Sequence, residues 1–145
     1  MTIADVLTRE QNGIFHCGGA WVRAHRRQLA TVVTIRGEID AFNAHQVGDH
    51  IRRFILGEDR VVLDMGDVSQ FSAAGISLLE TFDEDCRAEG VQWTLVAGPA
   101  VTELLGDCGD GTDFSSTCSL PQALHEVADA VARRRRLVLP LVRTS

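Results

Sequence analysis

The hydrophobic and polar positions along the first half of the chain predict two strands followed by a helix. Residues 20–25 and 29–36 are β-rich runs joined by the polar turn 26–28, which is typical of a β-hairpin. Residues 43–56 place apolar side chains at spacings of three and four, the period of an amphipathic helix. Asn43 is expected to cap this helix with its side chain.

The second half continues the alternation of strands and helices. Residues 60–65 form a short, nearly continuous apolar run, as expected for a strand covered on both faces. A long helix is predicted over residues 73–89, with Gly90 in the position of a left-handed C-cap. The elements expected after it are a strand, a short helix opened by a proline and a short strand, over residues 91–97, 99–105 and 114–118.

A final amphipathic helix is predicted after Ser119 and Gln122, which match a capping box. The helix is expected to run into residues 133–136, four arginines that suit the negative end of the helix dipole. Pro140 is expected to end or interrupt the helix, because proline lacks the backbone N–H that a helix interior uses.

This order of elements predicts a single α/β domain. Strands separated by helices favour right-handed crossovers and a mixed, mostly parallel sheet of four or five strands. The hairpin adds an antiparallel edge, and about four helices are expected to pack mainly on one side of the sheet. The domain is expected to span residues 15–136, between an N-terminal segment of residues 1–14 and a C-terminal tail of residues 137–145.

Composition narrows the classes of function that the chain can serve. Fourteen basic residues, all arginine, against 20 acidic residues give a net charge of −6, a poor match to direct nucleic-acid binding. The absence of lysine excludes a Schiff-base lysine and a P-loop lysine. Neither a signal peptide nor an apolar run long enough to cross a membrane is found. A cytoplasmic protein without membrane contact is therefore expected.

Two motifs resemble the signatures of STAS domains, the family of bacterial anti-sigma-factor antagonists. Residues 33–40 read VTIRGEID, and residues 61–65 read VVLDM, followed by Val68 and by SAAGI at residues 72–76. The similarity covers about residues 21–132. It implies a protein that binds an anti-sigma factor. That partner would be a serine kinase of the histidine-kinase-like ATPase type, and binding would release a sigma factor. The sequence shows neither paired catalytic carboxylates nor a Gly-x-Ser-x-Gly motif, so neither an enzyme nor a cofactor is expected.

The start of the second helix departs from the family pattern. Switchable members carry Asp-Ser-Ser-Gly at the start of the second helix and are phosphorylated on the second serine. The corresponding residues here are Ser72, Ala73, Ala74 and Gly75. Alanine has no hydroxyl group, so Ala74 cannot accept a phosphate. The sequence therefore predicts an antagonist that phosphorylation at this site cannot turn off.

The resemblance also indicates which residues would contact the partner. They lie in the loop before the first helix and at the start of the second: Glu38, Asp40, Asn43, Ser72, Ala73, Ala74 and Gly75. A structural role is an equal alternative for the loop residues, since Asp and Asn are common in turns and caps. Ser72 is interpreted mainly as the N-cap of the second helix. Whether the chain acts alone or as a homodimer stays open.

A ligand-sensing or redox-sensing STAS domain in another signalling complex is the alternative function. Cys108 and Cys118 flank a loop rich in glycine and aspartate, and a disulfide between them would close about ten residues. Reduced, inert thiols are the default expectation in the cytoplasm. No Cys-x-x-Cys motif occurs, and no metal site is predicted.

Overall fold

The computed structural model describes residues 14–27, 29–105, 116–117 and 119–144. Six strands form one sheet in the order of their numbers. The first three strands pair antiparallel, and the third to the sixth pair parallel. The strands are β1 Ile14–Cys17, β2 Ala20–Arg26, β3 Thr31–Ile39, β4 Arg60–Phe71, β5 Gln92–Ala97 and β6 Ser116–Thr117.

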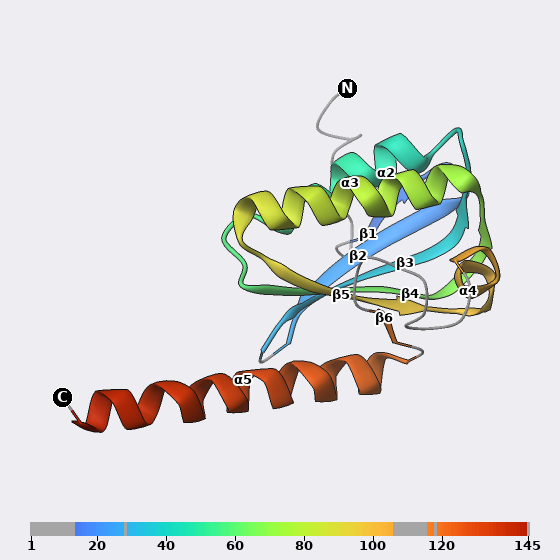
Figure 1. The fold of residues 1–145 in the computed structure, drawn as a ribbon. Coiled ribbons are helices and arrows are strands. Elements are labelled where there is room, and N and C mark those ends of the chain that lie inside the picture. The colour runs from blue at the N-terminus through green and yellow to red at the C-terminus, as the bar shows by residue number, and fades with distance from the viewer. Residues whose placement is uncertain (1–13, 28, 106–115, 118, 145) are drawn as a thin grey trace.

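Helices cover both faces of this sheet, with α2 and α3 together on one face and α5 on the other (Figure 1). They are α2 Ala44–Arg52, α3 Ala73–Glu89, α4 Pro99–Leu105 and α5 Leu120–Thr144. The predicted fold class, an α/β domain with a mostly parallel sheet and an antiparallel hairpin at one edge, is confirmed. The predicted number of strands, four or five, is too low, because residues 14–17 add β1 beside the hairpin and the sheet has six strands. Among the described residues, none of the helices is both long and apolar enough to span a membrane.

Alternation along the central strands divides the apolar side chains between two cores. Val33 and Leu63 belong to the large core that α2, α3 and α4 complete. Val32 and Val62, one residue earlier in each strand, belong to a smaller core under α5. Successive residues of a strand point to opposite faces, so the continuous apolar runs of β3 and β4 supply both cores. The sequence predicted burial on both faces for residues 60–65 of β4.

Several predicted boundaries agree with the structure and others do not. The predicted helices over 73–89 and 99–105 coincide with α3 and α4. The helix predicted over 43–56 is too long, because α2 ends at Arg52 and residues 53–57 form turns. Strand β4 continues six residues beyond the predicted 60–65, to Phe71.

The predicted end of the last helix at residues 133–136 is wrong, because α5 continues to Thr144. Pro140 therefore lies inside the helix. Proline lacks the N–H that would bond to the carbonyl four residues earlier. So close to the helix end, this removes a hydrogen bond from the final turns without terminating the helix.

Gly37 allows the turn between β1 and β2 to approach β3. Its φ is +97°, a conformation that other residues rarely adopt. A Cβ atom at this position would lie 2.2 Å from the carbonyl oxygen of Gly19. That same carbonyl accepts a hydrogen bond from the N–H of Glu38 at 3.0 Å. The edge hairpin therefore depends on a glycine at position 37.

We expect Gly37→Ala to lower the free energy of unfolding by at least about 2 kcal/mol, because it combines backbone strain with a steric clash. Gly48→Ala is the matched control: its Cβ would lie 3.6 Å from Leu78 Cγ, an ordinary contact. Gly48→Ala should raise the free energy of unfolding by about 0.5–1 kcal/mol, the difference in helix propensity. Urea denaturation measures both, and equal effects of the two variants would contradict the prediction.

Candidate functional site

The candidate site lies where the parallel strands β3 and β4 end. Ile39 pairs with Phe71 at the last position of the two strands, and the N–H of Ser72 donates to the carbonyl of Ile39 at 3.0 Å. The loop that follows β3 and the start of α3 are therefore side by side at one end of the sheet (Figure 1).

Asn43 holds this loop in place from inside the protein. Its side-chain NH2 group donates to the carbonyls of Glu38 at 2.8 Å and Cys17 at 3.2 Å, and its side-chain oxygen accepts from the N–H of Asp40 at 2.9 Å. The predicted capping role is wrong: Asn43 is the N-cap residue of α2, but its side chain makes no capping hydrogen bond. With 3% of its surface exposed, Asn43 supports the loop and offers a partner almost no surface.

The same loop presents an aromatic side chain to solvent. One carboxylate oxygen of Asp40 accepts hydrogen bonds from the N–H groups of Phe42 at 2.9 Å and Asn43 at 3.1 Å. Phe42 is 92% exposed, although its backbone is fixed by this turn. Sequence reasoning missed Phe42; the available signal was an aromatic residue just outside the periodic apolar face of the first helix.

Helix α3 begins with small, uncharged residues. The Ser72 hydroxyl accepts from the N–H of Ala74 at 3.3 Å, which confirms the predicted N-cap. Ala73 is exposed, Ala74 is half-buried and Gly75 is buried. A Cβ on Gly75 would lie 2.3 Å from the ring of Phe71, so this glycine permits close packing. The first turn carries no acidic residue.

The structure brings all seven predicted binding residues to the same end of the sheet, but they do not have equal access to solvent. Asn43 and Gly75 are buried and position the others. We call the remaining residues, together with Phe42, the β3–α3 surface: Glu38, Asp40, Phe42, Ser72, Ala73 and Ala74.

A groove between α2 and α3 adjoins this surface. The α2–α3 groove has a volume of about 470 Å³, and small residues, among them Ala44, Gly48, Ala74 and Ser77, form much of its lining. An ion pair between Arg52 Nε and Asp85 Oδ2, 2.8 Å apart, joins the two helices farther along. The groove therefore extends from the N-terminal ends of both helices towards this ion pair.

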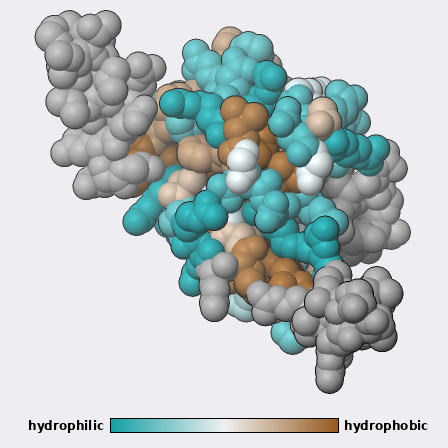
Figure 2. Space-filling model, turned by 90° about the vertical axis from the view of Figure 1, so that its left-hand side faces the viewer, coloured by the Kyte–Doolittle hydropathy of each residue, from teal (hydrophilic) through white to brown (hydrophobic). Residues whose placement is uncertain are grey.

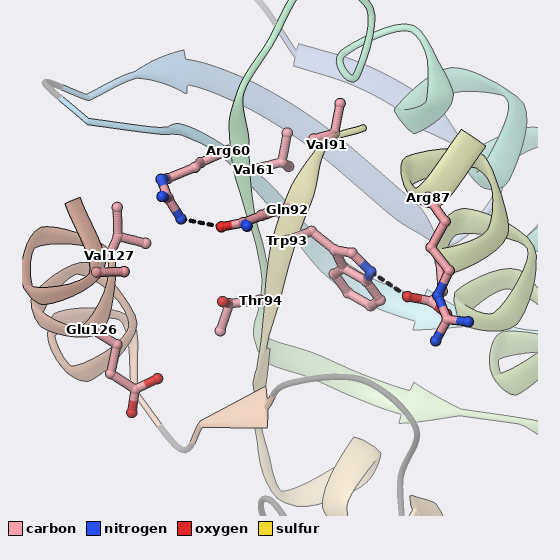
Figure 3. Close-up of a pocket in the computed structure, with 11 residues that line it drawn as sticks. Arg60, Val61, Arg87, Val91, Gln92, Trp93, Thr94, Glu126 and Val127 are labelled. Carbon is pink, nitrogen blue, oxygen red and sulfur yellow. Dashed lines mark hydrogen bonds and ion pairs between the residues drawn. The ribbon is translucent and has the colours of Figure 1, made fainter. Parts of the chain in front are cut away.

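A second hollow, of about 390 Å³, lies between β5, α3 and α5 (Figure 3). Its polar side chains bind one another: Arg60 donates to Gln92, and the Trp93 indole donates to Asp83 at 2.8 Å. Figure 2 faces this end of the molecule, where hydrophilic side chains surround separate hydrophobic patches. Because these polar groups are already paired, this hollow offers a ligand less than the β3–α3 surface does.

The described cysteines are buried free thiols. Cys17 donates from Sγ to Gln46 Oε1 at 2.8 Å. Burial, with the nearby Asp83 and Asp85 carboxylates, raises the pKa of the Cys86 thiol to about 12. Cys108 and Cys118 lie outside the described residues, so their disulfide stays a prediction.

Within the described ranges, no cluster of three or more His, Cys, Asp or Glu side chains could hold a metal ion.

We expect Asn43→Ala to lower the free energy of unfolding by about 2–3 kcal/mol, because it leaves buried backbone groups without partners. Asn43→Asp is the matched control, since it keeps the oxygen that binds the Asp40 N–H and loses both donors. Both variants should be destabilised in urea, and Asn43→Ala should make the Asp40 amide exchange faster with solvent. Unchanged exchange at Asp40 would contradict the clamping role.

The Cys86 thiol should make stability depend on alkaline pH. Its pKa is raised in the folded state from an ordinary value of 9.0 to about 12, so above pH 9 the unfolded chain loses a proton that the folded chain keeps. The contribution of Cys86 is therefore complete below pH 9 and is lost as the pH rises towards 12, by at most about 1.4 kcal/mol per pH unit. The stability difference between wild type and Cys86→Ala should shrink as the pH rises through this window; a constant difference would contradict the assignment.

Comparison with known proteins agrees with this architecture. Residues 22–109 match the STAS domain. Osmosensory protein A of Mycobacterium tuberculosis is 56% identical over 145 residues, covering 97% of this chain and 92% of that protein.

Solved structures share the fold at low sequence identity. An anti-sigma factor antagonist from Mycobacterium paratuberculosis superposes with a TM-score of 0.66 at 23% identity, over 75% of this chain and 94% of that one. An anti-sigma-factor antagonist (STAS) domain protein from Planctomyces limnophilus gives 0.61 at 17% identity, over 74% and 97%. The family match, which spans more than half of the sequence, and the close mycobacterial relative together show that this chain belongs to the STAS-domain family.

Proposed function

We propose that this protein is an anti-sigma-factor antagonist that binds an anti-sigma factor of the histidine-kinase-like ATPase type through the β3–α3 surface. Binding would occupy the anti-sigma factor and release a sigma factor in the cytoplasm. The role is one of binding, without catalysis or a cofactor. The observation that carries the proposal is the start of α3, where the Ser72 cap and half-buried Ala74 leave a small, neutral surface beside a rigid loop.

The physical reason is the sensitivity of a helix start to charge. The first turn of a helix has backbone N–H groups without helical partners and carries a partial positive charge. A phosphate at this position would add a charge of about −1.5 to −2 and three bulky oxygens. Ala74 has no hydroxyl to phosphorylate, so the surface keeps the neutral form that we assign to the bound state.

Phe42 supplies a large apolar contact that the small side chains at the start of α3 lack. Large aromatic residues often dominate the binding energy of protein interfaces. The Asp40 and Asn43 hydrogen bonds fix the backbone around Phe42 before any partner arrives. A preorganised loop loses less conformational entropy on binding, so we assign Phe42 the role of an anchor.

The neighbouring structures support this function, since two that share the fold are named anti-sigma factor antagonists. The Mycobacterium tuberculosis relative is named an osmosensory protein, and this name points to a stimulus to which the protein responds. We propose that this chain takes part in a response to osmotic stress, with the anti-sigma factor as its direct partner.

The test compares Ala74→Glu with Ala74→Ser in binding to a purified anti-sigma factor of the histidine-kinase-like ATPase type, by isothermal titration calorimetry. Ala74→Ser should bind within a few-fold of wild type, because its hydroxyl is small and neutral. Ala74→Glu should raise the Kd at least about tenfold, equivalent to 1.4 kcal/mol, through the added charge and bulk.

Ala128→Glu is the control, because it adds the same charge to an exposed alanine of α5, on the other face of the sheet. It should bind like wild type. If Ala74→Glu also binds like wild type, the start of α3 is not the contact surface. If wild type binds no such ATPase, the antagonist function itself is contradicted.

A further inference from the structure

We propose that two copies of this chain associate face to face, each inserting Phe42 into the α2–α3 groove of the other. A second copy would then cover the surface that binds the anti-sigma factor. The regulatory meaning of this dimer rests on the proposed function, but its existence does not.

An exposed side chain and a groove that the described residues leave unfilled lie on neighbouring parts of one face. Phe42 is 92% exposed and stands two residues before α2. The groove of about 470 Å³ is lined by Ala41 and Ala44, which flank Phe42 along the chain. A twofold interface uses the same patch on both copies, so it needs a projection and a matching recess within one patch. This face has both.

Gly48 gives the groove its depth without being required by the fold. Gly48 is not one of the described glycines that have a positive φ. A Cβ atom at this position would meet only Leu78 among the described residues, at 3.6 and 4.0 Å. Glycine inside a helix is less stable than alanine. Packing among the described residues therefore gives no reason for glycine here, whereas an inserted aromatic ring from a second copy would use the space.

The directions of the two helices fit such a pairing. Ala44 and Ala74 line the groove near the start of each helix, and Arg52 and Asp85 pair farther along both, so α2 and α3 run the same way. A twofold axis along the groove therefore places α2 of one copy over α3 of the other. It also keeps Phe42 at the end of the partner's groove that Ala74 lines.

Charge opposes this arrangement less than it opposes contact between other parts of the surface. The groove edge of α2 carries His45, Asp49 and Arg52, and the Asp49 carboxylate is 3.3 Å from His45 and 3.7 Å from Arg52. Helix α3 exposes Glu80 and Glu84. Placing α2 over α3 of the other copy brings Arg52 and His45 towards these glutamates, together with Asp49 of the same edge. Elsewhere, copies that each carry a net charge of −6 repel one another.

This dimer would supply the regulation that Ala74 cannot. Phe42 and Ala74 would be covered in the dimer and free in the monomer. The anti-sigma factor and a second copy would therefore compete for one surface. The concentration of the protein, in place of phosphorylation, would set how much of it can bind the anti-sigma factor.

The experiment is sedimentation equilibrium of wild type, Phe42→Ala and Gly48→Leu over a range of concentrations. Phe42→Ala removes the projection and keeps the groove, and Gly48→Leu fills the groove and keeps the projection. Each variant alone should weaken the dimer at least tenfold. An equimolar mixture should associate more strongly than either variant alone, because the heterodimer regains one of the two insertions.

Leu56→Ala is the matched control, because Leu56 is another exposed apolar residue, at 65% exposure, beyond the end of α2. It should dimerise like wild type, and thermal unfolding checks that Gly48→Leu is folded. Wild type that stays monomeric to about 100 μM overturns the proposal. So does a dimer that neither variant weakens, or a mixture no stronger than its components.

The two proposals fail in different ways. A chain that stays monomeric but binds the anti-sigma factor overturns the dimer and leaves the antagonist function standing. A chain that dimerises as described but binds no anti-sigma factor overturns the antagonist function and leaves the dimer standing.

Discussion

The buried amide of Asn43 is the interaction on which the candidate site depends. It joins the end of β1, the end of β3 and the start of α2. The Asn43 side chain bonds to backbone groups at the end of a strand or in the following turn. At these positions sheet pairing no longer satisfies the backbone groups. Without this amide, the Asp40 turn that presents Phe42 would lose its side-chain hydrogen bonds to the ends of β1 and β3.

The sheet then determines what lies beside that loop. Parallel pairing of β3 with β4 brings the two strand ends together, and the Ser72 N–H completes the connection by bonding to Ile39. The helix that starts there is capped, uncharged in its first turn and closely packed at Gly75. A rigid loop with an exposed aromatic ring therefore lies next to a helix start whose partial charge is available to a partner.

Local sequence signals predicted those elements whose determinants are themselves local. Helix α3 was predictable from its apolar spacing, the Ser72 cap and Gly90, whose φ is +72°. The end of α2 was not, because Phe54 and Ile55 keep helical spacing while the backbone at residues 53–57 forms turns. A periodic pattern shows which side chains face the core. Consecutive turns can direct side chains towards the core as well as a helix can, so the pattern does not fix where the helix ends.

The candidate site was predictable only in part, for the same reason. The resemblance placed the predicted binding residues of the loop beside the start of the second helix, and the structure brings both to one end of the sheet. Asn43 was misassigned because its true partners, the carbonyls of Cys17 and Glu38, are set by tertiary structure. Phe42 and the α2–α3 groove were missed because exposure and empty volume depend on how two helices pack.

We propose that the β3–α3 surface, and not the hollow beside β5, contacts the anti-sigma factor. Amide chemical-shift mapping of the isotope-labelled protein, titrated with the purified ATPase, would locate the contact. We expect shifts concentrated at Phe42, Ala73 and Ala74, with little change at Gln92 and Glu126. Shifts concentrated at Gln92 and Glu126, with Phe42 and Ala74 unmoved, would contradict the proposal.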